Sequence, residues 1–249
     1  MWFRPDYEQI SYDFDIERRV EKENICIQSE HTPPIRYDVV PQRTAKLDRR
    51  FMLAHIPVTQ ELWESVMGNN PSRFQGMQRP VENVSWEDCQ DFLAKLNEKK
   101  GELGVPRGYE FALPWESEWE HACRAGTETP FYFGLTLDEN LANFNSERRF
   151  WTTENKYLGG TSVVEKYPAN AWGLHDMHGN VWEWCQDAGG YGSLLVEGRT
   201  SVLDGFYRNR RGGSWATFAE QCQSAYRSFG NPARRHDDVG LRLCLAATE

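Results

Sequence analysis

The feature that most constrains this chain is a turn rich in Gly, Asp and Asn that leads into two tryptophans separated by one glutamate. Residues 173–185 read Gly-Leu-His-Asp-Met-His-Gly-Asn-Val-Trp-Glu-Trp-Cys. Side chains alternate across a strand, so Trp182 and Trp184 share one face and Glu183 lies between two apolar residues on the other. A bare buried carboxylate is very costly, so on a buried face Glu183 must be neutralised, hydrogen-bonded or bound to a cation.

Length and composition predict one loop-rich domain held together by aromatic side chains. The 249 residues, 39% of them hydrophobic, suffice to bury a sizeable core. Ten Trp, ten Tyr and thirteen Phe occur together with twenty Gly and twelve Pro. This combination is typical of folds in which large aromatic anchors, rather than long helices and strands, fix the loops.

Charge and hydropathy argue against two classes of protein. A formal net charge of −9 disfavours general nucleic-acid binding, which requires a basic surface. No run of 18 apolar residues occurs, and the first residues lack the apolar core of a signal peptide. We therefore expect a cytoplasmic protein without a membrane span.

The cysteines point to structural thiols rather than to a cysteine-based metal site or a disulfide framework. Six cysteines are spread along the chain, and no two of them form a Cys-x-x-Cys pair. An isolated cysteine between apolar neighbours usually behaves as a small core residue. We expect all of them to be reduced.

The chain divides into an N-terminal extension, residues 1–48, and a main domain, residues 49–249. The extension is highly charged, and we expect it to pack on the main domain as strands and loops. In the main domain, Thr59 and Ser85 are predicted N-caps of two helices, and Pro114 opens a third. Strands are predicted near residues 51–56, 109–113, 182–185 and 239–245.

Residues 126–167 form a long stretch without helical or strand periodicity. Gly, Thr, Asn and aromatic residues dominate it. A loop of this length inside a compact domain is usually functional or fixed by a ligand.

Several short motifs occur in a fixed order, and together they resemble one known family. They are Pro57-Val58-Thr59, Pro80-Val81-x-x-Val84-Ser85-Trp86, Leu113-Pro114-x-Glu116-x-Glu118-Trp119-Glu120, the segment 173–184, Arg211-Gly212-Gly213-Ser214-Trp215 and Gly240-Leu241-Arg242-Leu243. This set is similar to the formylglycine-generating enzyme, or sulfatase-modifying factor, superfamily. The resemblance implies an α+β, loop-rich variant of the C-type lectin fold with little regular secondary structure.

The resemblance does not extend to the copper site of the founding enzyme. That enzyme holds copper with two cysteines that follow its Gly-Gly-Ser motif, and soft metal ions require such thiolate ligands. Here the first position is Thr217 and only the second, Cys222, is a cysteine. We therefore expect no copper and no catalytic residue, unless Cys222 acts alone.

A second branch of the superfamily serves in iron-dependent oxidoreductases that hold the metal on a separate helical domain with clustered histidines. Among the six histidines here, only His175 and His178 lie close together in the sequence. A formylglycine-generating-enzyme-like or iron-associated oxidoreductase remains the alternative function.

A third branch comprises the variable proteins of diversity-generating retroelements, in which a constant frame surrounds diversified ligand-binding positions. The C-terminal segment fits this layout, with a frame at Gly212-Gly213-Ser214-Trp215, Ala219, Cys222, Ala225, Arg227, Pro232 and Gly240-Leu241-Arg242-Leu243. Besides Gly230, the intervening positions are Ala216, Thr217, Phe218, Glu220, Gln221, Tyr226, Ser228, Phe229, Asn231, His236 and Asp237. Aromatic residues mixed with small polar ones are typical of adaptable binding surfaces.

This third resemblance implies a binding protein whose C-terminal face recognises a protein or another macromolecule. Two other interpretations remain open for the same residues: an ordinary surface loop in a relative that is not diversified, and an interaction module with fixed partners.

The resemblance also implies a calcium site in the turn before the Trp-Glu-Trp strand. Its ligands would be the side chains of Asp176 and Glu183 and the carbonyls of Gly179 and Val181, because calcium prefers hard oxygen ligands. A second family site, at Asn143 and the carbonyl of Phe144, is expected to be lost, because its acidic partner falls near Lys156.

Seven arginines and four acids occur between residues 204 and 242. This local excess of positive charge would suit an anionic partner. The simpler interpretation, which we favour, is that these arginines pair with acids and backbone carbonyls of the protein itself.

Overall fold

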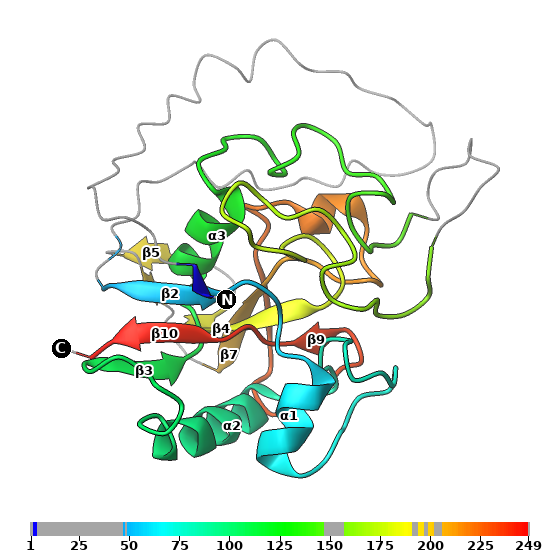
Figure 1. Cartoon of the computed structure of the whole chain (residues 1–249). Coiled ribbons are helices and arrows are strands. Elements are labelled where there is room, and N and C mark those ends of the chain that lie inside the picture. Colours follow the sequence, from blue (N-terminus) through cyan, green and yellow to red (C-terminus); the bar gives the residue numbers. More distant parts are fainter. Residues whose placement is uncertain are drawn as a thin grey trace, which may run out of the picture.

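The computed structural model of the chain describes residues 2–3, 47, 49–146, 157–190, 194–196, 199–201 and 206–248 (Figure 1). The predicted N-terminal extension, the loop position Lys156 and residues 202–205 therefore lie almost entirely outside the described residues. Residues 147–155, 191–193 and 197–198 also lie outside the described residues, and the other parts of the predicted main domain can be compared with the sequence directly.

Two four-stranded sheets organise the described part of the chain (Figure 1). The first has the order β1-β2-β10-β3 and is antiparallel; its strands are Trp2–Phe3, Phe51–Ala54, Cys244–Ala247 and Tyr109–Ala112. The second has the order β8-β7-β4-β9, with strands Ser228–Gly230, Tyr207–Arg211, Trp182–Gly189 and Val239–Gly240. In it, β9 runs parallel to β4 and the other pairs are antiparallel. A small hairpin joins β5 (Leu194–Val196) and β6 (Arg199–Ser201).

Three α-helices begin close to the predicted positions. They are α1 (Gln60–Met67), α2 (Trp86–Glu98) and α3 (Glu116–Arg124), and a short 3₁₀ helix η1 spans Ala219–Cys222. Thr59 caps α1 by accepting the Leu62 N–H, and Ser85 forms a full capping box with Asp88, as predicted. The third helix begins two residues after Pro114, with Trp115 as its N-cap.

The strand β4 confirms the predicted alternation of the Trp-Glu-Trp segment. Trp182 and Trp184 are buried in a core cluster that also contains Trp63, Phe92 and residues of β9 and β10. Cys185, from the opposite face, belongs to a second cluster around Trp119 of α3. The strand thus lies between two apolar layers, and Glu183 is buried on the α3 side.

The predicted strand 239–245 is wrong in one respect, because the chain makes two short strands there in different sheets. Val239–Gly240 pairs with β4, whereas Cys244–Ala247 pairs with β2 and β3. Between them, Arg242 is fully buried and directs its guanidinium to Glu183 and to the carbonyls of Ala54 and His175. Arg242 thus lies in the short stretch that separates the two strands.

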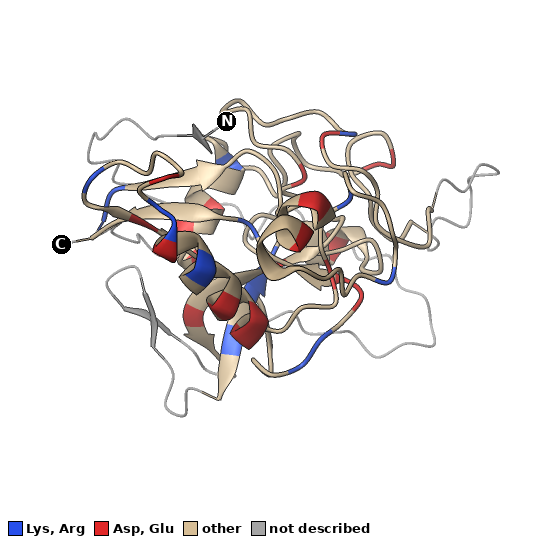
Figure 2. Ribbon diagram, turned by 60° about the horizontal axis from the view of Figure 1, so that its bottom comes forward, with Lys and Arg blue, Asp and Glu red and all other residues tan. Residues whose placement is uncertain are grey.

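Figure 1 shows α1 and α2 on one side of the sheets, α3 on the other, and the long loops gathered beyond α3 and β4. Figure 2 shows acidic and basic residues on both the helices and the loops of the described part of the chain; α2 itself carries four acids and one lysine. No helix among the described residues is both long and apolar enough to cross a membrane.

Candidate functional site

The C-terminal segment starts from a glycine turn that packs directly on the protein interior. β7 ends at Arg211, and Gly212 and Gly213 then adopt φ angles of +96° and +74°. A Cβ atom on Gly213 would lie 2.4 Å from the Cys222 sulfur, so only glycine fits. The carbonyl of Gly212 accepts the N–H of Gly179 at 2.7 Å, which ties this turn to the turn before β4.

Thr217 and Cys222 occupy adjacent places, as the family resemblance implies, but they do not form a thiolate pair. The Thr217 hydroxyl lies 3.6 Å from the Cys222 sulfur, and it also accepts the Ser214 N–H at 2.8 Å. Cys222 is fully buried, and this burial raises the pKa of its thiol to about 12. A neutral thiol beside a hydroxyl is a poor ligand set for copper.

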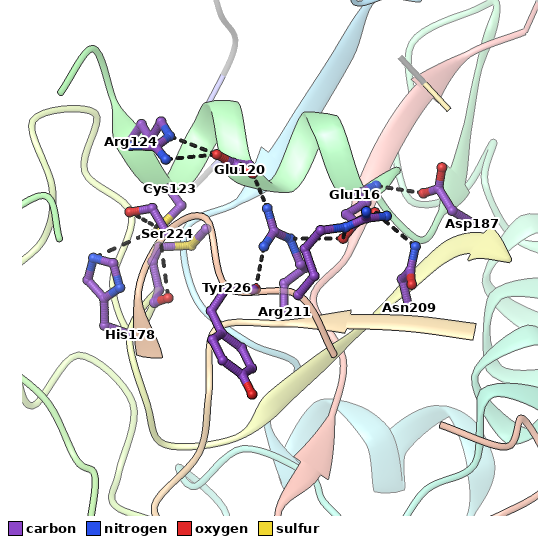
Figure 3. Close-up of polar contacts among 12 residues, drawn as sticks. Glu116, Glu120, Cys123, Arg124, His178, Asp187, Asn209, Arg211, Ser224 and Tyr226 are labelled. Carbon is purple, nitrogen blue, oxygen red and sulfur yellow. Dashed lines mark hydrogen bonds and ion pairs between the residues drawn. The ribbon is translucent and has the colours of Figure 1, made fainter. Parts of the chain in front are cut away.

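His178 is held as a neutral structural residue next to this turn (Figure 3). Its Nε2 accepts the N–H of Tyr132 at 3.1 Å, which leaves Nδ1 to donate to the carbonyl of Cys222 at 2.7 Å. Burial lowers the pKa of His178 to about 3. His175 contacts the carbonyl of Tyr167 instead, and the described residues contain no cluster of three His, Cys, Asp or Glu suited to a metal ion.

A buried ionic network attaches the C-terminal segment to α3 (Figure 3). Arg227 binds both carboxylate oxygens of Glu116 at 2.7 Å, and Asn209 donates to the same carboxylate at 2.8 Å. Arg211, 1% exposed, pairs with Glu116 and Glu120. Arg211 and Arg227 therefore agree with the simpler interpretation, whereas the guanidinium of Arg208 packs over the ring of Trp86 and its Nε has no hydrogen-bond partner among the described residues.

Glu183 meets its predicted need for compensation through hydrogen bonds and an arginine. Arg242 donates to both carboxylate oxygens, at 2.8 and 2.9 Å, and Trp119 Nε1 donates at 2.6 Å. All three side chains are at most 1% exposed, so the charge of Glu183 is balanced without an ion.

The predicted calcium ligands do not fit a calcium ion in this arrangement. A cation bound to Glu183 would face the guanidinium of Arg242 across the same carboxylate. Asp176 is buried, with one oxygen accepting the Glu165 N–H and the other without a partner among the described residues. Burial raises the pKa of Asp176 to about 6.

The eleven predicted ligand-binding residues share one property, because each is partly or fully exposed. They are Ala216, Thr217, Phe218, Glu220, Gln221, Tyr226, Ser228, Phe229, Asn231, His236 and Asp237. Most of the frame is buried, namely Gly212, Gly213, Ser214, Cys222, Gly240, Leu241, Arg242 and Leu243. The remaining frame residues are half-buried, except Ala225, which is exposed.

One group of the predicted residues gathers around Trp215. The indole Nε1 donates to the carbonyl of Asp237 at 3.1 Å, and the ring of Phe74 meets the indole edge-on at 5.1 Å between ring centroids. The carboxylate of Asp237 pairs with Arg73. Sequence reasoning missed Arg73 and Phe74, since no motif marks them and they lie about 140 residues away.

A second group lies along β8, at the edge of the second sheet among the described strands. The ring of Tyr226 is 6.1 Å from that of Trp182, and Ser228 accepts Arg210 Nε at 3.1 Å. The ring of Phe229 lies 5.4 Å from Tyr207, which is itself 37% exposed and was not predicted. Nothing in the sequence indicated that Tyr207 lies next to β8.

Comparison with known proteins places this geometry in context. The family described as sulfatase-modifying factor enzyme 1-like domain matches residues 16–247. The chain is 30% identical to the serine/threonine-protein kinase pkn1 of Chlamydia caviae over 169 residues, which cover 66% of this chain and 23% of that protein. It is 28% identical to the formylglycine-generating enzyme of Mus musculus, over 77% of this chain and half of that enzyme.

Among solved structures, variable protein 1 of Treponema denticola superposes with a TM-score of 0.65 and 30% identity, covering 78% of this chain and 84% of that one. This match confirms the predicted loop-rich α+β fold and the resemblance to variable proteins. The chain spans about a quarter of the length of the first curated relatives that it matches.

Proposed function

The chain belongs to the sulfatase-modifying factor enzyme 1-like family, and we propose that it is a ligand-binding variable protein of a diversity-generating retroelement. In this proposal, a protein or another macromolecule binds to the eleven intervening positions between Ala216 and Asp237. The observation that carries the proposal is that none of these eleven positions is buried, three being exposed and eight half-buried, whereas eight of the thirteen frame residues around them are buried.

The frame residues make contacts that can hold the backbone in place when the sequence of the intervening positions changes. Arg227 and Arg242 are tied to the buried carboxylates of Glu116 and Glu183, and Ser214 donates to Asp238 at 2.9 Å. These contacts fix the backbone without using the side chains of the intervening residues. Substitution of an exposed side chain away from such contacts usually changes stability by less than about 0.5 kcal/mol.

Similarity to a variable protein supports the same function. The protein of Treponema denticola bears that name, and it matches the present chain over most of both lengths at 30% identity. This likeness is our reason to propose that the surface is diversified and that it binds a macromolecular ligand.

The family also contains enzymes, but the residues here favour binding over copper chemistry. Thr217 replaces a ligand thiolate, and the thiol of Cys222 has a raised pKa in a fully buried place. His175 and His178 make separate hydrogen bonds to backbone groups and do not converge.

The proposal is tested by sequencing the 3′ end of this gene and its flanking DNA in many sibling cells. We expect substitutions at the eleven intervening positions, confined to adenines of a nearby template repeat, and an unchanged frame. The codons for Arg227 and Arg242 serve as internal controls, since both residues are structural. A tail that never varies, in DNA without a template repeat or reverse transcriptase, would overturn the proposal.

A further inference from the structure

A cavity of about 600 Å³ opens beside Trp215 but outside the C-terminal segment. One wall consists of Phe74, Gln75 and Arg79, and the other of residues 158–163 with Lys166. Phe74, which lines the cavity, is the residue that meets the indole of Trp215 edge-on. The cavity therefore borders the proposed binding face, although no intervening position lines it.

The charged groups that line the cavity are all positive. They are the guanidinium of Arg79 and the ammonium of Lys166, on a protein with a net charge of −9. The carboxylate of Glu165 is adjacent in sequence, but it pairs with His55 at 3.0 Å and is not part of the lining. The cavity therefore favours a negatively charged group in spite of the overall charge of the protein.

Arg79 is already positioned, and part of it remains available. Its Nη1 donates to the carbonyl of Thr161, which joins the two walls of the cavity. Among the described residues, its other nitrogens have no hydrogen-bond acceptor. A guanidinium held in this way can donate to a carboxylate with little further loss of side-chain entropy.

Ser162 supplies an independent indication of a ligand. Its side chain is 3% exposed, it lines the cavity, and its hydroxyl has no hydrogen-bond partner in the described part of the chain. A buried hydroxyl without a partner is costly, and such groups in native proteins are rare. The hydroxyl oxygen is enclosed, so an oxygen of a bound anion accepts this hydrogen bond after the short Ser162 side chain rotates toward the cavity.

Part of the rim of the cavity is apolar. Leu158 and Val163 are 47% and 46% exposed, and Phe74, whose ring meets that of Trp215, also lines the cavity. A ligand that reaches the cations therefore places an apolar group against this rim.

We propose that this cavity is a second, constant subsite that binds an anionic side chain of a peptide ligand, flanked by an apolar residue. The anion contacts Arg79, Lys166 and Ser162, and the apolar neighbour packs on Leu158, Val163 and Phe74. Because its lining residues are outside the C-terminal segment, this subsite does not depend on whether the tail is diversified.

The test measures binding of a fluorescein-labelled peptide, Gly-Phe-Glu-Leu-Gly, to the whole chain by fluorescence anisotropy. A peptide with Gln in place of Glu and one with phosphoserine are the matched probes. We expect the anionic peptides to bind and the Gln peptide to bind on the order of tenfold more weakly, with affinity falling as salt increases. Comparison of the affinities for the Glu peptide and the phosphoserine peptide shows whether the cavity prefers a carboxylate or a phosphate.

Two variants localise the binding. Lys166→Glu, at an exposed position, should weaken binding roughly tenfold, and Ser162→Ala roughly fivefold. Lys100→Glu, an equal charge change at an exposed position after α2, is the control and should have no effect. Equal binding of the Glu and Gln peptides, no binding of any peptide, or an unchanged affinity in Lys166→Glu would overturn the proposal.

A further pair of variants separates this subsite from the proposed tail function. Phe218→Ala and Phe229→Ala change half-buried tail positions that do not line the cavity. Peptide binding should remain unchanged in both, even if the tail proves constant among sibling genes. Loss of peptide binding in both would contradict a subsite at the cavity.

Discussion

Frame and intervening residues alternate along one stretch of chain, from residue 211 to 243, yet they have opposite environments. Frame residues such as Ser214, Cys222 and Arg242 are fully buried and make specific contacts to distant elements. The intervening residues are exposed or half-buried, and some of them, such as Phe229 and Asp237, contact partly exposed neighbours. One segment can therefore carry the stability of the domain and a substitutable surface at the same time.

Thr217 is the position where this contrast is weakest. Its hydroxyl accepts the Ser214 N–H and contacts Cys222, so an intervening side chain completes the turn of the frame. Substitutions that keep a hydroxyl at this position should be tolerated better than others. The remaining intervening residues are expected to be less restricted.

The largest effect is expected from breaking the Arg242–Glu183 pair. Arg242→Met leaves the buried carboxylate of Glu183 without its counter-ion, which should lower the free energy of unfolding by about 3–5 kcal/mol. Urea unfolding measures this change. Arg234→Met, at an exposed arginine in the same tail, is the control and should change stability by less than about 0.5 kcal/mol. Similar losses in the two variants would remove the contrast between frame and surface.

The next effect concerns the glycine turn. Gly213→Ala introduces a Cβ at φ +74°, 2.4 Å from the Cys222 sulfur, and should cost about 3 kcal/mol through strain and overlap. Gly68→Ala is a matched control, because Gly68 has φ +77° but no atom within 4 Å of the added Cβ. It should cost only about 1 kcal/mol, and thermal unfolding compares the two. An equal cost would mean that the contact with Cys222 is unimportant.

A smaller, pH-dependent effect is expected from Glu82, whose Oε1 accepts the N–H of Phe74 beside Trp215. Burial raises its pKa from 4.5 to about 7, so its contribution to stability is full below pH 4.5 and is lost as the pH rises through 7. Glu82→Gln should remove up to about 3 kcal/mol of this decline.

Urea unfolding at several pH values between 4 and 8 gives the difference in the free energy of unfolding between the wild type and Glu82→Gln. Asp176, whose pKa is raised to about 6, produces a decline of the same sign in both proteins and cancels in the difference. Parallel stability curves for the two proteins would contradict a raised pKa at Glu82.

The smallest effect is expected from calcium. Since Arg242 already balances Glu183, we expect 1 mM-scale calcium or a chelator to leave the melting temperature unchanged within about 1 °C. Differential scanning fluorimetry measures this, with magnesium as the control ion. Stabilisation by calcium but not by magnesium would show that the turn at Asp176 binds calcium in spite of Arg242.

The sequence predicted the features that depend on neighbouring residues. The caps at Thr59 and Ser85 and the alternation around Glu183 follow from local hydrogen bonding and side-chain direction, and all three are confirmed. The motifs predicted the fold through the family. The role of the eleven tail positions in ligand binding stays a prediction.

Features that depend on distant contacts could not be predicted in this way. The partner of Glu183 lies 59 residues away at Arg242, and this pairing divides the last strand between two sheets. The cavity brings together residues 74–79 and 158–166, which share no motif. Only the unusual length of the loop after residue 126 indicated that a site was present there.

The most direct test of the account is a pair of libraries displayed on the surface of cells. One randomises the eleven intervening positions, and the other randomises Gly213, Ser214, Cys222, Arg227, Arg242 and Leu243. Protease resistance reports folding in both libraries. We predict that most members of the first library fold and that selection on varied protein targets yields binders, whereas few members of the second fold. Equal tolerance in the two libraries, or no binders from the first, would contradict the division of the tail into a structural frame and a binding surface.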